Sequence, residues 1–350
     1  MKRFIIKTLF YCIPFVCIYG GCKIVIDGFY DGDIGRLGKI SFGNEYSKSL
    51  KENYLQNKLT IDTLIVTYEK LQIPNVSKKI FTIGDSFSKQ GIFGYQNYLA
   101  HLLKDSIVNI EIYGGHLLTA VSLLNSGIID SSNCQIMILQ TVDRNLIVTL
   151  NSTDFEVRYK LPKTGMQKVK DLDEDSQNKK NTKKDSELYN LCSYIRLRWF
   201  NYNNPILEHS LKQECFTHNK FSRKLFYYKD DMNFRNTSKA DISKAKENLI
   251  LLNKKFSEKG IKLIFLIAAD KYDVYRPFTV DNTLPVDTTT DELSQIPGVC
   301  VIDTKPMLQE MVRNGEKDVY MVNDTHWSYK GSEAVARKLA HTIDSIEILK

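Results

Sequence analysis

The stretch KKIFTIGDSFSKQG, residues 78–91, is the part of the sequence that indicates the fold. Its apolar and β-branched residues 80–83 predict a short buried strand. Gly84 then allows a sharp turn without a Cβ clash, and Ser86 follows at the carboxyl end of the strand, the edge where open α/β sheets bind ligands. Alternatively, Gly-Asp-Ser is a polar strand exit in which Asp85 or Ser86 caps the next helix. A base for Ser86 elsewhere in the chain would favour the functional alternative.

Strand-like and helix-like segments alternate along the rest of the chain. The expected strands cover residues 80–83, 106–115, 134–142, 261–270 and 298–304, and the expected helices cover residues 94–105, 116–127, 239–260 and 330–343. Strands that alternate with helices of this length form right-handed βαβ units around a parallel sheet. The sequence therefore predicts an α/β protein. No internal repeat and no glycine-rich phosphate loop is present.

The alternation is interrupted by an insertion at about 151–236. Its charged part, Lys163 to Glu187, contains almost no large apolar residue, so we expect it to be mobile and dispensable for folding. The part that follows is aromatic and basic. We expect it to pack as a small subdomain beside the sheet, and the alternative is a lid or a sugar-binding surface.

The amino terminus has the pattern of a signal anchor. Lys2, Arg3 and Lys7 precede an apolar run that ends at Lys23, and basic residues before such a run place the amino-terminal side in the cytoplasm. Residues 1–26 are therefore expected to be an uncleaved transmembrane anchor, followed by a linker and N-terminal extension over 27–77. Lipidation at Cys22, after two glycines, is an alternative, and so is a buried helix of a soluble protein.

Composition excludes several classes of site. The net charge of +7 is modest and accompanies no nucleic-acid-binding motif, so we expect no nucleic-acid partner. None of the seven cysteines forms a CxxC pair, so neither a zinc site nor a disulfide framework is indicated, although Cys192 and Cys215 could pair in an oxidising compartment. No cluster of His, Cys and acidic residues has ligand spacing. The sequence therefore predicts no metal and no cofactor.

The stretch VYMVNDTHWSYKG, residues 319–331, supplies the base that Ser86 needs. An imidazole is the usual base for a serine hydroxyl at neutral pH, and a carboxylate fixes its tautomer. Asp324 and His326 flank Thr325 just before the last helix, where a loop opens at the same sheet edge as Ser86. We expect Trp327 to pack in the core and to hold this loop.

These motifs resemble the SGNH (GDSL-like) hydrolase superfamily, with Gly84-Asp85-Ser86-Phe87 as the first block and Asp324-Thr325-His326 as the last. The DTHW form, followed by Gly331, is similar to the alginate O-acetylation proteins, although the last block of the superfamily usually reads Asp-x-x-His. The resemblance covers about 78–150 and 239–349. It implies a flavodoxin-like, three-layer parallel sheet over residues 78–350.

The resemblance also implies functional residues. Ser86, Asp324 and His326 would form the catalytic triad. Gly114 or Gly115, after the second strand, would supply an oxyanion-hole N–H. Three further residues are expected at the oxyanion or substrate-binding site, namely Arg144 in the QTVDRN segment and Lys271 and Tyr275 in the AADKYDVYRPF segment. His101 and His116 are expected to be structural.

The expected function is transfer of acetyl groups to an extracytoplasmic polysaccharide, on the periplasmic side of the bacterial inner membrane. The resemblance implies a polysaccharide acceptor and a membrane-bound O-acyltransferase partner that supplies acetyl groups. Two alternatives are a carbohydrate acetylesterase with the same triad and a non-catalytic protein that binds or assembles polysaccharide. Transfer and hydrolysis differ in the acceptor alone, so the triad does not separate them.

Overall fold

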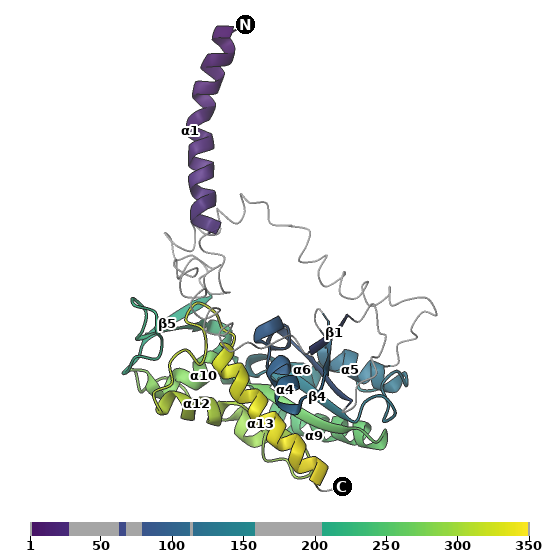
Figure 1. Ribbon diagram of the computed structural model, residues 1–350. Coiled ribbons are helices and arrows are strands. Elements are labelled where there is room, and N and C mark those ends of the chain that lie inside the picture. Colours follow the sequence, from purple (N-terminus) through teal and green to yellow (C-terminus); the bar gives the residue numbers. More distant parts are fainter. Residues whose placement is uncertain (1, 28–62, 68–78, 113–114, 158–204, 349–350) are drawn as a thin grey trace.

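The computed structural model describes residues 2–27, 63–67, 79–112, 115–157 and 205–348 (Figure 1). Its centre is a six-stranded sheet with the order β1-β3-β2-β4-β7-β8, in which every neighbouring pair is parallel. The strands are β1 (Thr63–Thr67), β2 (Ile80–Gly84), β3 (Ile107–Glu111), β4 (Ile136–Val142), β7 (Lys262–Ala268) and β8 (Cys300–Asp303). The predicted α/β fold with a parallel sheet is confirmed.

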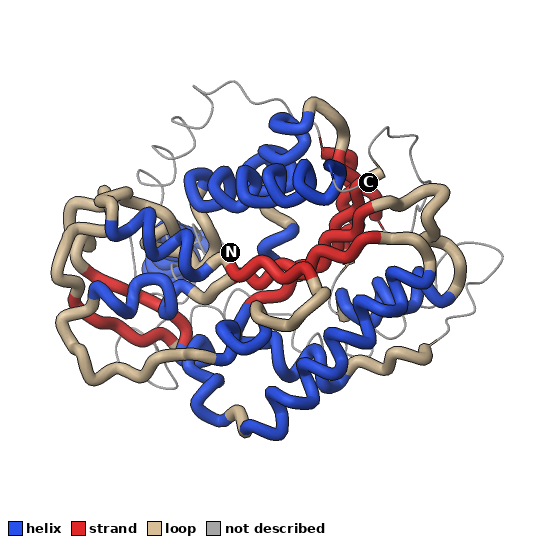
Figure 2. Tube along the Cα trace, turned by 90° about the horizontal axis from the view of Figure 1, so that it is seen from below, coloured by secondary structure: helices blue, strands red, loops and turns tan. Residues whose placement is uncertain are grey.

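Helices cover both faces of this sheet, as Figure 2 shows. One face packs against α4 (Tyr95–Leu103), α12 (Lys305–Arg313) and α13 (Tyr329–Ile348). The other face packs against α5 (His116–Asn125), α6 (Asp143–Ser152) and α9 (Lys239–Glu258). From β2 onward, the strands follow the order 2-1-3-4-5 of a doubly wound sheet, whose ligands bind beyond the carboxyl ends of the strands.

The two cores follow from the period of two along each strand. In β7, Ile264 and Leu266 belong to the core under α13, whereas Leu263 and Phe265 belong to the core under α9. A parallel strand buried on both faces requires such a continuous apolar run. The apolar segments expected to be strands are therefore the central strands of the sheet.

The helix ends follow their sequence signals. Helix α9 begins at a capping box, in which the Ser238 and Asp241 side chains bond each other's backbone N–H groups. It ends just before Gly260, whose φ of +71° favours glycine. Strand β1 was not predicted, because residues 63–67 lie inside the expected linker over 27–77. It pairs with β3 and extends the sheet by one strand.

The described end of the insertion packs into the core that includes α4 and α13. It contains an antiparallel hairpin of β5 (Ile206–Ser210) and β6 (Lys224–Tyr228), followed by a short helix over Lys229–Asn236. Phe216, Phe226 and Tyr227 are buried in the core that includes α4 and α13. These three aromatic residues therefore pack, as expected of a subdomain. The charged part, Lys163 to Glu187, and the start of the aromatic, basic part up to residue 204 lie outside the described residues, so the alternative of a lid or sugar-binding surface is untested there.

Helix α1 spans Lys2–Asp27 and contains Pro14 (Figure 1). Among the residues that the structure describes, no helix is both long enough and apolar enough to cross a membrane. The predicted transmembrane anchor over residues 1–26 is therefore not supported. Its uncharged part lies between Lys7 and Lys23 and is shorter than the roughly 20 residues that cross a bilayer.

Candidate active site

The turn after β2 is built around Gly84. A Cβ at this position would lie within 3.0 Å of Ser88 Oγ and of two atoms of the Gln140 side chain. Glycine is therefore required here by a close approach between β2 and β4, and not by a positive φ. The Gln140 Oε1 atom uses this space to accept hydrogen bonds from the Asp85 N–H, at 3.1 Å, and from Ser88 Oγ, at 3.0 Å.

Asp85 holds the turn in place with its carboxylate. Its Oδ1 accepts the Phe87 N–H at 3.0 Å and caps the short 3-10 helix over Ser86–Ser88. Its Oδ2 accepts the Val142 N–H at 2.6 Å, at the end of β4. Asp85 is therefore a cap, as the alternative interpretation allows, and Ser86 remains exposed at the carboxyl edge of the sheet.

The loop that carries Asp324 and His326 is held from within the core. Trp327 is fully buried, and its Nε1–H donates to Tyr320 Oη at 2.9 Å. The Tyr320 hydroxyl in turn donates to the Ala269 carbonyl after β7, at 2.6 Å. Phe87 contacts both His326 and Trp327, with ring centroids 4.8 Å and 4.7 Å away. The packing role predicted for Trp327 is confirmed. Its contact with Phe87 connects the turn after β2 to the loop that carries His326.

These elements bring Ser86, His326 and Asp324 together. Ser86 Oγ lies 2.8 Å from His326 Nε2, and His326 Nδ1 lies 2.5 Å from Asp324 Oδ1. The same Oδ1 accepts the His326 backbone N–H at 3.0 Å. This is the hydroxyl–imidazole–carboxylate arrangement in which the imidazole can take the serine proton while the carboxylate fixes its orientation. The expected juxtaposition is therefore present in the structure.

The charge of Asp324 is stabilised by His326. Burial opposes ionisation of this carboxyl, but the hydrogen bond from the imidazole, the charge of His326 and the His326 backbone N–H outweigh it. Together with the nearby Lys271 ammonium, they lower the pKa of Asp324 to about 2. Asp324 is thus a carboxylate at neutral pH, which is the state that orients an imidazole.

Lys271 and Tyr275 do not line a cleft, because both side chains are fully buried. Lys271 Nζ donates to the carbonyls of Met321, Val322 and Asp324 at 2.7, 3.0 and 3.0 Å. The Tyr275 hydroxyl accepts the Tyr320 N–H at 3.1 Å. Both residues lie in α10 (Lys271–Tyr275), which follows shortly after β7. From there they support the loop that carries Asp324 and His326, here called the histidine loop. Sequence reasoning placed them near the site but assigned them the wrong task.

Arg144 lies at the amino end of α6 and binds two buried acids. Its guanidinium forms ion pairs with Asp270 and Asp231, and its backbone N–H donates to Asp270 Oδ2 at 2.6 Å. It lines a pocket of about 520 Å³ whose walls include neither Ser86 nor His326. The ion pairs give Arg144 a structural task, and its contact with substrate stays a prediction.

Of the two glycines considered for the oxyanion hole, Gly114 lies outside the described residues. Gly115 precedes α5 with a φ of +57°, a conformation that favours glycine. The next residue, His116, is buried, and its Nε2 lies 2.8 Å from the Thr141 hydroxyl. Burial lowers the pKa of His116. His116 is therefore a hydrogen-bonded core residue, as expected.

A known protein family matches the part of the chain that carries Asp324 and His326. Residues 224–349 match the family described as SGNH hydrolase-like domain, acetyltransferase AlgX. This part of the chain is an SGNH hydrolase-like domain of the AlgX type. The predicted resemblance is confirmed over 239–349, which includes Asp324 and His326, and it stays a prediction over 78–150. Ser86 lies outside the matched range, so its place in the site depends on the hydrogen bond to His326. No curated protein matches the chain.

Sequence reasoning missed Gln140, and it did not predict which groups Asp85 and Lys271 bind in this site. Gln140 could have been noticed, because a fully buried amide interrupts the apolar run of β4. The bond of the Asp85 carboxylate to Val142 and the bonds of the Lys271 ammonium to the histidine loop could not be recognised from neighbouring residues. Their partners lie far away in the sequence.

Replacing Gly84 with alanine is expected to lower the free energy of unfolding by about 2–4 kcal/mol. The new Cβ would displace Gln140 and Ser88 and so break their hydrogen bonds. Denaturant unfolding measures this change. Gly20→Ala is the control, because a Cβ at Gly20 in α1 has open space; equal stability of the two variants would show that the close packing at Gly84 is unimportant.

Proposed function

We propose that the protein is an O-acetyltransferase that transfers acetyl groups to a polysaccharide through Ser86, His326 and Asp324. The observation that carries this proposal is the chain of contacts from Ser86 Oγ to His326 Nε2, and from His326 Nδ1 to Asp324. The match of residues 224–349 to an AlgX-type acetyltransferase domain supports two parts of this proposal, namely that acetyl is the group transferred and that a polysaccharide is the substrate.

The reaction proceeds in two steps that share one base. In the first, Ser86 Oγ attacks the acetyl carbonyl while His326 Nε2 takes the serine proton, and that proton then passes to the departing donor oxygen. In the second, a sugar hydroxyl attacks the acetyl-serine, loses its proton to His326, and leaves as the acetyl ester while Ser86 regains a proton. Backbone N–H groups at Ser86 and at Gly114 or Gly115 would stabilise the oxyanion.

Water in place of the sugar hydroxyl would make the same protein an acetylesterase. Exposure of Ser86 at the sheet edge admits both acceptors. The predicted extracytoplasmic location and the predicted acyltransferase partner are consistent with transfer to an exported polysaccharide. Both stay predictions.

Substituting Ser86 with alanine is expected to reduce acetyl turnover by about 10⁴-fold or more, because no other group replaces the nucleophile. The full-length protein is incubated with an activated acetyl ester and an oligosaccharide acceptor. Free acetate and acetylated sugar are measured separately, and the ratio distinguishes transfer from hydrolysis. Ser345→Ala, an exposed serine on α13, is the control. Unchanged turnover in the Ser86 variant would show that Ser86 is not the nucleophile, and wild-type protein without any turnover would favour the non-catalytic alternative.

A further inference from the structure

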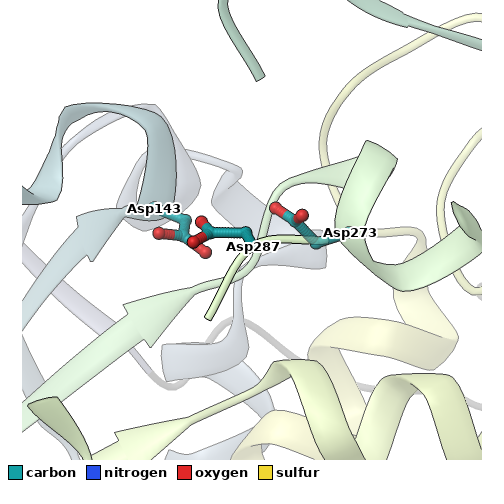
Figure 3. Close-up of side chains that lie close together, drawn as sticks. All are labelled: Asp143, Asp273 and Asp287. Atoms are coloured by element: carbon teal, nitrogen blue, oxygen red, sulfur yellow. The ribbon is translucent and has the colours of Figure 1, made fainter. Parts of the chain in front are cut away.

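Three carboxylates that are far apart in the sequence meet at the carboxyl edge of the sheet (Figure 3). Asp143 begins α6 directly after β4, Asp273 lies in α10 after β7, and Asp287 lies just before α11 (Thr289–Leu293). One oxygen from each lies within 4.8 Å of the other two. The three residues are 5–6% exposed. Sequence spacing gave no indication of this cluster, because each acid comes from a different loop.

The surroundings leave part of this charge without a partner. Asp143 Oδ2 and Asp273 Oδ2 are buried and have no hydrogen-bond partner among the described residues. Asp287 Oδ1 accepts one bond, from the Thr289 N–H at 2.7 Å. Unsatisfied carboxylate oxygens are rare in protein interiors, and an absent ion or water is a common reason for them.

The nearby cations are bound to other groups. Arg144 pairs with Asp270 and Asp231. Lys305 Nζ donates to the Asp287 carbonyl and the Thr290 hydroxyl, and it pairs with Asp291. The ion pairs of Arg144 and Lys305 are thus made with acids outside the cluster.

An ion from solvent can reach the cluster. Asp143 and Asp287 line the same pocket of about 520 Å³ as Arg144, which has room for bound water. Calcium takes six to eight oxygen ligands at about 2.3–2.6 Å, so two of its ligands stand up to about 5.2 Å apart. Magnesium demands near-octahedral geometry and is usually held by only one or two carboxylates, whereas calcium accepts more carboxylates in a flexible geometry. Three carboxylate oxygens that all lie within 4.8 Å of one another therefore suit calcium better.

We propose that Asp143, Asp273 and Asp287 bind a calcium ion, with water from the pocket completing its coordination. The ion joins the end of β4, helix α10 and the segment before α11. Because α10 begins with Lys271, which holds the histidine loop, the ion stabilises the platform beneath that loop. This role is structural and is independent of the proposed acetyl transfer.

The test uses the full-length protein after removal of metal with EDTA. Dialysis against calcium is expected to leave one ion per chain, measured by atomic absorption, and to raise the melting temperature by about 5 °C. Asp273→Asn and Asp143→Asn are expected to lose both the ion and the shift. In EDTA these two variants should melt no lower than the wild type, because each removes a repelling charge. Asp230→Asn, an exposed neighbour, should keep both responses.

Three results would overturn the assignment. The first is wild-type protein that retains no calcium after dialysis. The second is calcium binding of equal stoichiometry in the Asp273 and Asp143 variants. The third is a melting shift with magnesium and none with calcium, which would exclude calcium as the ion.

Discussion

Replacing His326 with alanine is expected to abolish covalent labelling of Ser86 by a serine-reactive phosphonate. The Ser86 hydroxyl is a weak nucleophile until the imidazole, 2.8 Å away, removes its proton. Loss of the base from a serine triad lowers the rate by about 10⁴–10⁶-fold. Labelling rates followed by intact-protein mass spectrometry measure this effect without any knowledge of the natural donor or acceptor.

The control for this experiment is His341→Ala, which removes an exposed histidine from α13. It should label at the wild-type rate. The melting temperature of both variants is measured as well, because Phe87 packs against the His326 ring. If the His326 variant remains folded and labels as fast as the wild type, Ser86 is not activated by His326. The proposed function, which rests on the contact between these two residues, would then be wrong.

Replacing Lys271 with methionine is expected to be the most destabilising of the single substitutions considered. The methionine keeps the volume but removes a fully buried ammonium that serves three loop carbonyls. Carbonyls left unpaired in the interior lower the free energy of unfolding by about 3–5 kcal/mol in total. The expected fall in melting temperature is about 10 °C. Phosphonate labelling of Ser86 should also slow, because the loop that positions His326 loses its support.

Lys246→Met is the control, since its ammonium forms a surface ion pair with Glu292, and such pairs contribute little to stability. Its melting temperature should change little. A folded Lys271 variant with wild-type stability and labelling rate would mean that the loop is held by Trp327 and Tyr320 alone. A loss of stability with an unchanged labelling rate would contradict the positioning role.

Most of the sheet could be predicted because its strands are apolar runs separated by amphipathic helices. Strand β7 and helix α9 follow this rule over their whole length. Strand β1 was missed because its neighbours, 28–62 and 68–77, are polar and have no helical or strand period. The apolar start of the chain favoured a membrane anchor, yet apolar character alone does not distinguish a spanning helix from a shorter apolar one.

The meeting of Ser86, His326 and Asp324 was predictable because serine activation needs these three residue types, and Gly-Asp-Ser and Asp-Thr-His occur at strand and helix boundaries. The tasks of the supporting residues were not predictable in the same way. A sequence contains the charge of Lys271 or Asp273 but not its burial, and burial decides whether a lysine contacts substrate or holds a loop. The carboxylate cluster exists only where three strand exits meet, so it required the fold.

The separation of Ser86 and His326 by 240 residues also determines when these two side chains can first meet during synthesis. At about 5–20 residues per second, the ribosome needs roughly 10–50 s to pass from one residue to the other. Throughout that interval the nascent chain contains Ser86 without its proposed base. Under the proposed function, acetyl transfer therefore begins only when the last loop docks, and a half-made chain would be unable to consume an acetyl donor.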